Sequence, residues 1–168
     1  MAKAKIVGID AFLEQLETTQ AHSSAVVGQM IYDGAGIVAD EVRRRILMIP
    51  EREVYETSGG KHHTRGITDI EREGLLDSLG ISKMRVDGGF YNVAIGFDGY
   101  NANVTASYPY GHPNSMVARS IESGTSWLAK TPFIATAVSA TRGMAVKAME
   151  KVFDNATSGN RYGRYSRR

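Results

Sequence analysis

A long amphipathic stretch in the first third of the chain constrains the fold more than any other feature. Over about residues 24–48, apolar side chains recur every three or four positions, which is the spacing of one helix face. The stripe consists of Val27, Ile31, Ala35, Val38, Val42 and Ile46. Gly34 and Gly36 each lower helix propensity by roughly 1 kcal/mol relative to alanine, so we expect a second backbone to pack closely there. Pro50 is expected to end the helix.

The residues before this stretch predict a short strand and a separate helix. Residues 3–7 are typical of a weak opening strand. Asp10 is placed to cap a helix, because its side chain can accept a hydrogen bond from a free amide of the first turn. The apolar face of that helix would consist of Phe12, Leu13 and Leu16.

Another helix is expected to begin at Thr68, where the sequence TDIE forms a capping box. The Thr68 hydroxyl can accept from the amide of Glu71, while the Glu71 carboxylate accepts from the amide of Thr68. Its apolar face consists of Leu75, Leu76 and Leu79. Gly80 is expected to end this helix.

The middle of the chain changes to an alternating pattern that predicts half-buried strands. The alternating residues are Met84, Val86, Tyr91, Val93, Ile95 and Phe97. The sequence Asp87-Gly88-Gly89 between them predicts a hairpin turn. Residues 100–113 are rich in Tyr, Pro and Gly and predict a surface loop.

The C-terminal half predicts two further helices joined by an elbow. Ser115 is expected to cap a short helix, and Gly124 to end it in the left-handed conformation. Thr131 is expected to cap the last helix, with Pro132 at the first helical position, where its missing N–H costs nothing. The apolar side of the last helix would run from Ile134 through Val138, Ala145, Met149 and Val152 to about Phe153.

These elements predict an α+β fold: a small antiparallel sheet packed by a long helix in the N-terminal half and a long C-terminal helix, with extended loops. The length of 168 residues suits one domain, which we place at residues 1–155. Within it, residues 51–66 lack an apolar period and predict a long exposed loop or extended hairpin. Residues 156–168 predict a basic flexible tail, which ends in RYGRYSRR with four Arg and no acidic residue.

Several functional classes find no support in the sequence. The chain has no cysteine and a formal net charge of only +2, too little to indicate a nucleic-acid binder. His62 and His63 are adjacent and would point to opposite faces of a strand, so they are poorly placed to share one metal. Serine, histidine and carboxylate motifs of known enzymes are missing, and no apolar run reaches the roughly 18 residues of a membrane helix. We therefore expect no catalysis, cofactor, metal or membrane partner.

The basic tail leaves two interpretations open. Alternating Arg and Tyr suit phosphate contact and base stacking, which would make the chain a nucleic-acid-binding module together with His62, His63 and Arg65. The same tail could instead dock on an acidic neighbouring subunit. We favour the protein partner, because the rest of the chain is almost neutral.

Several spaced segments resemble one family, in the same order along the chain. KIVGIDAFLEQLE, VADEVRRRI, LLDSLGISKM and VAIGFDGYN are similar to successive segments of the tail-component family of long-tailed bacteriophages, the small neck or tail-completion proteins of head-to-tail joining. The most specific match is ARSIESGTS followed by TPFIATAV, which resembles the family's E-x-G-T and P-F signature. The chain departs from the family in the longer stretch at 50–66 and in Ala135 and Thr136, where the family has Arg and a second Pro.

The resemblance implies a structural virion protein of the neck or tail region, made in the bacterial host cytoplasm. Such proteins form a ring, expected here to hold six copies, between a head-completion or adaptor protein and the tail terminator or tail tube protein. Genomic DNA would pass through the lumen without sequence-specific binding. A tail-terminator ring that caps the tail tube is the alternative layer. Residues 51–66, 100–113 and the tail would be extensions that order on assembly.

The resemblance and the composition together give a set of candidate interface residues. They are Lys61, His62, His63, Arg65, Glu122, Gly124, Thr125, Trp127, Pro132, Phe133, Arg161, Arg164, Arg167 and Arg168. Trp127 and Phe133 could seat the elbow on the core or on a neighbouring subunit. Glu122 is expected to pair with an Arg or a backbone donor, within the chain or across an interface.

Overall fold

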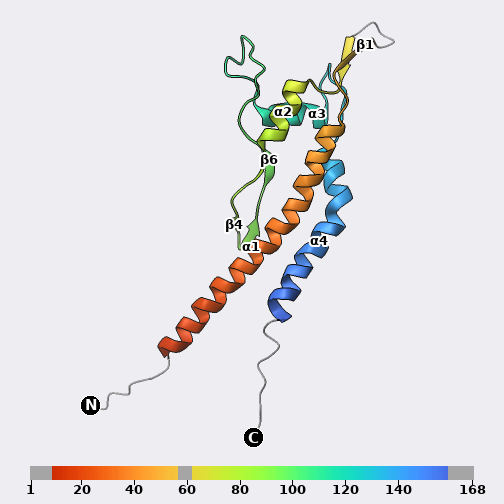
Figure 1. Cartoon of the computed structure of the whole chain (residues 1–168). Coiled ribbons are helices and arrows are strands. Elements are labelled where there is room, and N and C mark those ends of the chain that lie inside the picture. The colour runs from red at the N-terminus through yellow and green to blue at the C-terminus, as the bar shows by residue number, and fades with distance from the viewer. Residues whose placement is uncertain (1–8, 57–61, 159–168) are drawn as a thin grey trace, which may run out of the picture.

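Two long helices form an arm that extends from a smaller head. The computed structural model describes residues 9–56 and 62–158, and side chains over 23–56 and 62–156. Helix α1 (Ile9–Met48) spans about 60 Å at 1.5 Å per residue, and α4 (Ile134–Ser158) runs antiparallel beside it. The other elements gather around the end of α1 and the start of α4 (Figure 1). The strand expected at residues 3–7 lies outside the described residues.

The N-terminal half holds one helix where the sequence predicted two. Asp10 lies in the first turn of α1 instead of capping a separate helix, and α1 continues unbroken to Met48. No glycine or proline occurs between Asp10 and Val27, so neither of the usual helix-ending residues separates the two predicted helices. The end of α1 just before Pro50 is confirmed.

Small side chains let α1 and α4 approach closely. Ala35 and Ala39 of α1 are buried, as are Ala137, Thr141 and Ala145 at every fourth position of α4. These positions correct the predicted apolar side of α4, because Val138 is 46% exposed and the helix continues past Phe153 to Ser158. The contact face is thus set by residue size as well as by polarity.

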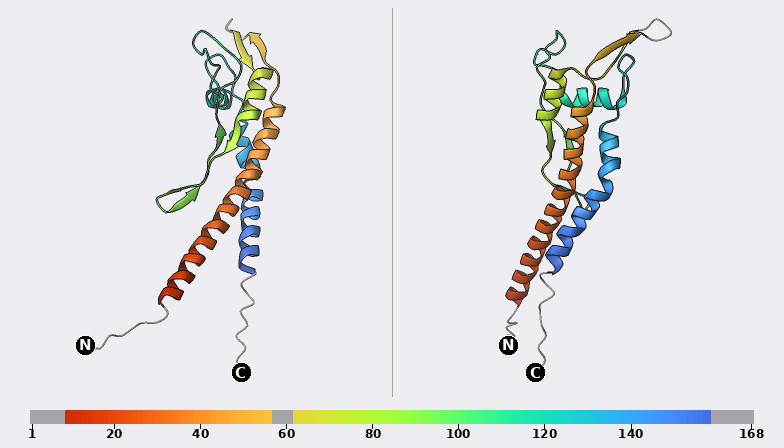
Figure 2. Two further views of the ribbon diagram at one scale, coloured as in Figure 1. Left: turned by 60° about the vertical axis from the view of Figure 1, so that its left-hand side comes forward. Right: turned by 45° about the vertical axis from the view of Figure 1, so that its right-hand side comes forward.

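Only one of the two glycines expected at a close contact lies at one. A Cβ atom on Gly34 would come within 2.1 Å of the Met149 terminal methyl, so a side chain of α4, and not the second backbone that was predicted, occupies the space. A Cβ atom on Gly36 would meet nothing within 4 Å. Figure 2 shows that the two helices lie together near the head and separate toward the first turn of α1. Among the described residues, no helix has the length and apolarity needed to cross a membrane.

The hydrophobic core lies in the head. Its buried members come from both ends of the chain and from the segments between: Val42, Ile46, Ile49, Ile67, Leu75, Leu79, Val117, Ala118, Ile121, Leu128, Phe133 and Ala137. The last turns of α1, the helices α2 (Asp69–Ser78) and α3 (Asn114–Ser123), and the start of α4 therefore enclose one core. Burying this apolar surface is the main term that fixes the head.

Helix α2 begins at the predicted capping box and is tied to the segment before it. The Thr68 hydroxyl accepts from the amide of Glu71, and a Glu71 carboxylate oxygen accepts from the amide of Thr68 at 2.9 Å. The same oxygen accepts from the Arg52 guanidinium at 2.7 Å, so buried Glu71 is neutralised. The prediction that Gly80 ends α2 was wrong, because the helix ends at Ser78 and Leu79–Ile81 forms strand β3.

Of the six strands in the described residues, four lie in one long hairpin, in two ladders. β3 (Leu79–Ile81) pairs antiparallel with β6 (Ile95–Phe97), and β4 (Arg85–Asp87) pairs antiparallel with β5 (Phe90–Asn92). Between the ladders, three residues on one strand face two on the other, which is a bulge. The Asp87-Gly88-Gly89 turn is confirmed, since Gly88 and Gly89 have φ of 57° and 84°.

The hairpin is fixed to α1 at its bulge and projects beyond it. The Tyr32 hydroxyl donates to the Ser82 carbonyl at 3.2 Å and accepts from the Met84 amide at 2.9 Å. Past this point β4 and β5 leave the body of the molecule (Figure 2). The prediction of half-buried strands is therefore wrong for β4 and β5, all of whose residues are exposed, including Phe90.

A second hairpin and two loops complete the head. β1 (Glu53–Glu56) and β2 (His62–Arg65) pair antiparallel, so the extended-hairpin alternative for 51–66 is confirmed. Residues 98–113 lie mostly at the surface, but Gly111 is buried. This position requires glycine, because its φ is 95° and the Asn101 carbonyl leaves no room for a Cβ. Helix α3 follows Pro113 with no side-chain cap, so Ser115 does not have the capping role predicted for it. The architecture is α+β, with four helices and small antiparallel sheets in the part of the chain that the structure describes.

Replacing Leu75 by alanine should test how far the head depends on its core. Leu75 is fully buried in α2, so Leu75→Ala should lower the free energy of unfolding by about 2–5 kcal/mol. Ile70→Ala on the same helix is the matched control, because Ile70 is 45% exposed and should cost far less. Urea denaturation measures both. Equal losses for the two variants would contradict the placement of the core.

Candidate partner-binding site

The elbow, defined as residues 124–133, is a compact loop between α3 and α4. Gly124 begins it with φ of 74° and ψ of 170°, so its φ is positive as predicted while its backbone is more extended than a left-handed helical turn. A Cβ there would come within 3.0 Å of the Lys130 amide nitrogen, so the position requires glycine. Thr125 closes the loop, since its hydroxyl accepts from the Leu128 amide at 3.0 Å and its amide donates to the Leu128 carbonyl.

Glu122 is the residue that starts helix α4. Its two carboxylate oxygens accept from the amides of Ile134 at 2.8 Å and Ala135 at 2.9 Å. The first amides of a helix have no acceptor within the helix and carry partial positive charge. A carboxylate there stabilises the helix, because it accepts from these amides and lies at the positive end of the helix dipole. Glu122 thus has an intrachain partner, one of its two predicted alternatives.

The cap predicted for α4 was placed on the wrong residues. The helix begins at Ile134, so Thr131 and Pro132 precede it instead of occupying its cap and first position. The Thr131 amide donates to the Ile121 carbonyl at 2.8 Å, and the Phe133 carbonyl accepts the first helical hydrogen bond. The Thr131-Pro132 pair suggested where α4 starts, whereas the acceptor for its first amides is Glu122 of the preceding helix α3.

The two aromatic residues of the elbow have opposite environments. Phe133 is only 3% exposed and packs against Phe97, with ring centroids 6.1 Å apart. Trp127 is 51% exposed. Of the two destinations that the sequence left open, Phe133 lies in the core of its own chain, while Trp127 remains available to a partner.

The structure brings the elbow together with the β1–β2 hairpin. The Thr64 amide donates to the Trp127 carbonyl at 2.7 Å, and the Ala129 amide donates to the Thr64 carbonyl at 2.8 Å. These bonds make a parallel bridge between Thr64 and Leu128. Two segments that the sequence predicted separately as interface regions are therefore adjacent in the head.

Three aromatic side chains, which we call the aromatic row, occur in the segments that meet at this bridge: exposed Tyr55, half-buried His63 and exposed Trp127. Tyr55 is opposite His63 in the β1–β2 ladder, with ring centroids 6.0 Å apart, and the bridge pairs the two residues that follow His63 and Trp127 in the chain. Residues paired across two strands, such as Tyr55 and His63, share one face of a sheet. Tyr55 was missed from the sequence, although the Val54-Tyr55 pair, which is typical of a strand, was a usable signal.

The remaining predicted interface residues do not form one cluster. His62 is exposed at the start of β2, and Pro132 is exposed on the elbow. Arg65 is engaged by Glu53 across the hairpin, with 2.6 Å between its guanidinium nitrogen and the carboxylate oxygen. The other five, Lys61, Arg161, Arg164, Arg167 and Arg168, lie outside the described residues.

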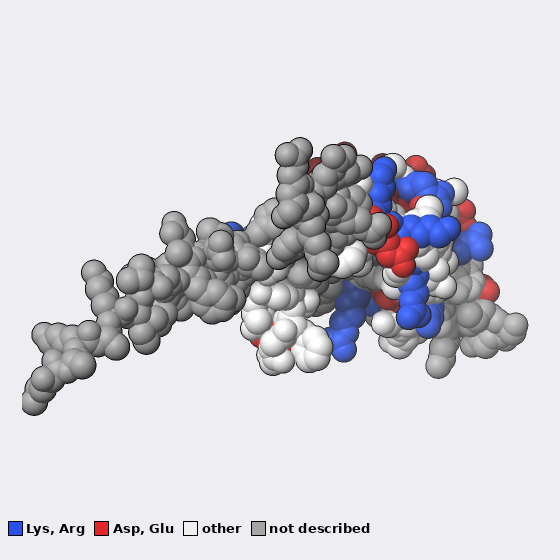
Figure 3. All heavy atoms as spheres, turned by 90° about the horizontal axis from the view of Figure 1, so that it is seen from below, with Lys and Arg blue, Asp and Glu red and all other residues white. Residues whose placement is uncertain are grey.

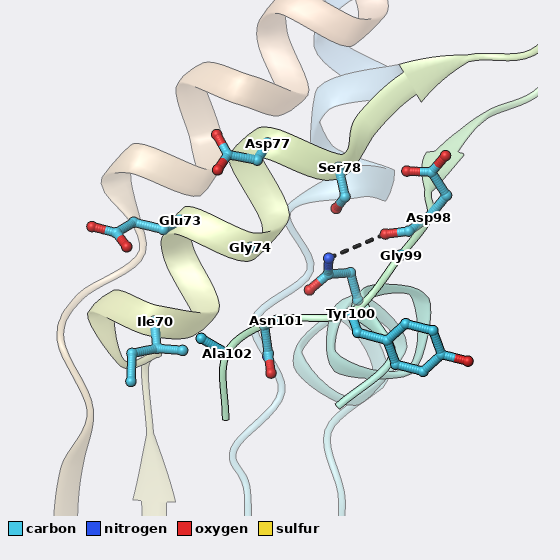
Figure 4. Close-up of a pocket in the computed structure, with 11 residues that line it drawn as sticks. Ile70, Glu73, Gly74, Asp77, Ser78, Asp98, Gly99, Tyr100, Asn101 and Ala102 are labelled. Carbon is cyan, nitrogen blue, oxygen red and sulfur yellow. Dashed lines mark hydrogen bonds between the residues drawn. The ribbon is translucent and has the colours of Figure 1, made fainter. Parts of the chain in front are cut away.

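A pocket of about 330 Å³ lies between α2 and residues 98–102, and no residue of the aromatic row lines it. Three carboxylates line it, from Glu73, Asp77 and Asp98. Figure 4 shows that the carboxylates of Glu73 and Asp77 lie on one side of α2 and that of Asp98 on the other, so they do not converge. In the described part of the chain, no three His, Asp or Glu side chains are close enough to hold a metal ion.

Charged side chains are mixed on the surface. In the view from below, Lys and Arg alternate with Asp and Glu on the visible face (Figure 3). On α1, a side-chain hydrogen bond from Arg44 lowers the pKa of Glu41, and the same hydrogen bond raises the pKa of Arg44. This pair stabilises a helix surface and is not part of the elbow.

The chain was compared with models of protein families, with curated proteins and with solved structures, and none of these comparisons returned a match. Function is therefore inferred from the sequence motifs and from the geometry of the head.

Removing the Glu122 carboxylate should loosen the start of α4. Glu122→Ala should lower the free energy of unfolding by about 1–2 kcal/mol, the usual cost of losing a helix cap. Hydrogen exchange of the Ile134 and Ala135 amides should become faster, because they lose their acceptors. Ser123→Ala, at the exposed neighbouring position, is the control. Unchanged exchange at both amides would contradict the capping role.

Proposed function

We propose that this chain is a structural subunit of the head-to-tail connection of a long-tailed bacteriophage, where copies form a ring around the DNA passage. The observation that carries the proposal is the exposure of large apolar side chains on two separate elements: Trp127 on the elbow and Phe90 on the β4–β5 hairpin, 51% and 78% exposed. A ring subunit needs unlike surfaces, because each copy contacts its two neighbours through different faces. The resemblance of spaced segments to the neck and tail-completion family supplies the biological setting.

The signature residues of that resemblance have physical roles that support a shared fold. Glu122 caps α4, Gly124 allows the tight entry into the elbow, and Phe133 anchors the elbow in the core. An E-x-G-T motif followed by P-F thus specifies a helix–elbow–helix unit. The motif explains how the elbow folds, while partner contact is assigned to exposed Trp127.

The assembly mechanism follows from the two projecting hairpins. The β1–β2 hairpin stands at the top of the head, whereas β4 and β5 leave the side of α1 (Figures 1 and 2). A head-to-tail contact that uses one hairpin on one neighbour and the second on the other closes into a ring when the rotation fits, with six copies expected. A tail-terminator ring remains the alternative layer, since it would use the same surfaces.

A nucleic-acid-binding module is the less supported reading of the described residues. Arg65 is paired with Glu53, and acidic side chains are interspersed with basic ones on the face seen in Figure 3. A phosphate-binding surface needs a continuous excess of Lys and Arg.

Disrupting the gene in the phage or prophage that carries it tests the proposal. Filled heads and separate tails should accumulate, and negative-stain electron microscopy should show that they fail to join. A plasmid copy of the gene should restore joined particles. Intact, infectious virions in the absence of the protein would refute a role in head-to-tail joining.

Trp127→Ala should separate assembly from folding. Because Trp127 is half exposed, we expect a loss below about 1 kcal/mol in the free energy of unfolding but defective joining in the complementation assay. Met144→Gln is the control, since Met144 is 56% exposed on α4, outside the elbow and both hairpins. Normal joining with Trp127→Ala would remove the aromatic row from the interface.

A further inference from the structure

We infer that the pocket behind α2 is a docking site for the Arg-rich C-terminal segment, residues 159–168, of a second copy of this chain. The pocket lies between α2 and residues 98–102, with the start of α3 beneath them. Its lining contains three acidic residues and no Lys or Arg. The contact would join neighbouring copies in the proposed ring. Only its role in closing a ring rests on the proposed function; the binding itself does not.

The carboxylates of the pocket are available for a cationic partner. Glu73, Asp77 and Asp98 are exposed and take part in none of the salt bridges among the described residues. Glu41, Glu53 and Glu71 elsewhere in the chain are each bound by an Arg of the same chain. The pocket is thus a local excess of negative charge in a chain whose formal net charge is +2.

Buried amides in the pocket wall provide a second, independent indication of a ligand. Asn101 and Asn114 are 5% and 3% exposed, and within the described part of the chain the Asn101 amide nitrogen and the Asn114 amide oxygen have no hydrogen-bond partner. The other half of each amide is occupied: the Asn101 oxygen accepts two backbone amides, and the Asn114 nitrogen donates to the Asp98 carbonyl. Unsatisfied buried polar atoms are costly.

These unsatisfied groups favour a peptide over a metal ion. The Asn101 nitrogen is a donor and the Asn114 oxygen is an acceptor. A peptide backbone can satisfy both, with a carbonyl and an amide, whereas a metal ion can satisfy only the acceptor. The Ser78 hydroxyl, also buried without a partner among the described residues, points from the end of α2 toward the same space (Figure 4). Two of the three carboxylates of the pocket lie on one side of α2 and the third lies on the other, so an extended segment with several cations fits them better than one ion does.

The C-terminal segment has the complementary chemistry. Arg161, Arg164 and Arg167 recur every third residue, about 10 Å apart in an extended chain, and Tyr162 and Tyr165 lie between them. Guanidinium groups pair with carboxylates in a bidentate manner and stack on aromatic rings. At the rim of the pocket, Tyr100 is 64% exposed and offers such a ring.

Chain length requires that the segment come from another copy. Helix α4 has 25 residues and is about 37 Å long. The ten residues from 159 to 168 span at most about 35 Å when fully extended. Because the last turn of α4 and helix α2 lie at opposite ends of the molecule (Figures 1 and 2), the segment cannot bring its arginines to the pocket of its own chain. It can reach the pocket of a neighbouring copy whose head lies near the end of its own α4.

The test uses a fluorescein-labelled peptide of residues 159–168 and the full-length chain. We expect fluorescence anisotropy to report binding that weakens as salt is raised. Glu73→Arg with Asp77→Arg should weaken binding by about tenfold or more, because both contacts become repulsive. Asp33→Arg with Glu56→Arg is the matched control, since it changes the net charge equally at exposed sites outside the pocket, and it should bind more tightly than the pocket variant.

Exchanging the charges guards against a misfolded variant. A peptide with the four Arg replaced by Glu should bind the pocket variant and not the original chain. Three results would each overturn the docking site. The natural peptide could fail to bind, the pocket and control variants could bind it equally, or a peptide with Lys for Arg and Ser for Tyr could bind as well as the natural one. The proposed function fails on a different result, joined virions without the protein, so either proposal can fall while the other stands.

Discussion

The hydrophobic core holds the head together, and the carboxylate of Glu122 is the constraint that sets how α4 leaves that core. It joins the end of α3 to the first amides of α4, and so fixes the direction in which α4 leaves the core and returns along α1. The elbow closed by this contact also supplies the edge to which β2 is bridged through Thr64. One side chain therefore relates the arm, the core and the β1–β2 hairpin to one another.

Sequence patterns predicted the elements whose signals are local. The capping box at Thr68, the Gly88-Gly89 turn and the end of α1 before Pro50 each depend on residues within a few positions of one another. The start of α4 was misplaced because its cap comes from Glu122, twelve residues before Ile134. Likewise, nothing local in the sequence shows that small residues of α4 face α1.

The candidate site was predictable in part, for the same reason. Both segments of the aromatic row were expected at an interface, but their adjacency depends on a long-range bridge between Thr64 and Leu128. The acidic pocket was not foreseen, since the end of α2 and residues 98–102 line one pocket only when β3 pairs with β6. Of the residues expected at one surface, Glu122 and Phe133 instead hold the elbow, whereas Trp127 is exposed.

The small side chains between α1 and α4 have a consequence for how stability is distributed. The head buries branched residues such as Ile46 and Leu75, whereas the arm buries Ala35, Ala39 and Ala145, each of which removes far less apolar surface from water. The free energy of local opening should therefore fall along the arm, away from the head. In the proposed ring, this gradient would let the arms of the copies change their spread without unfolding the heads.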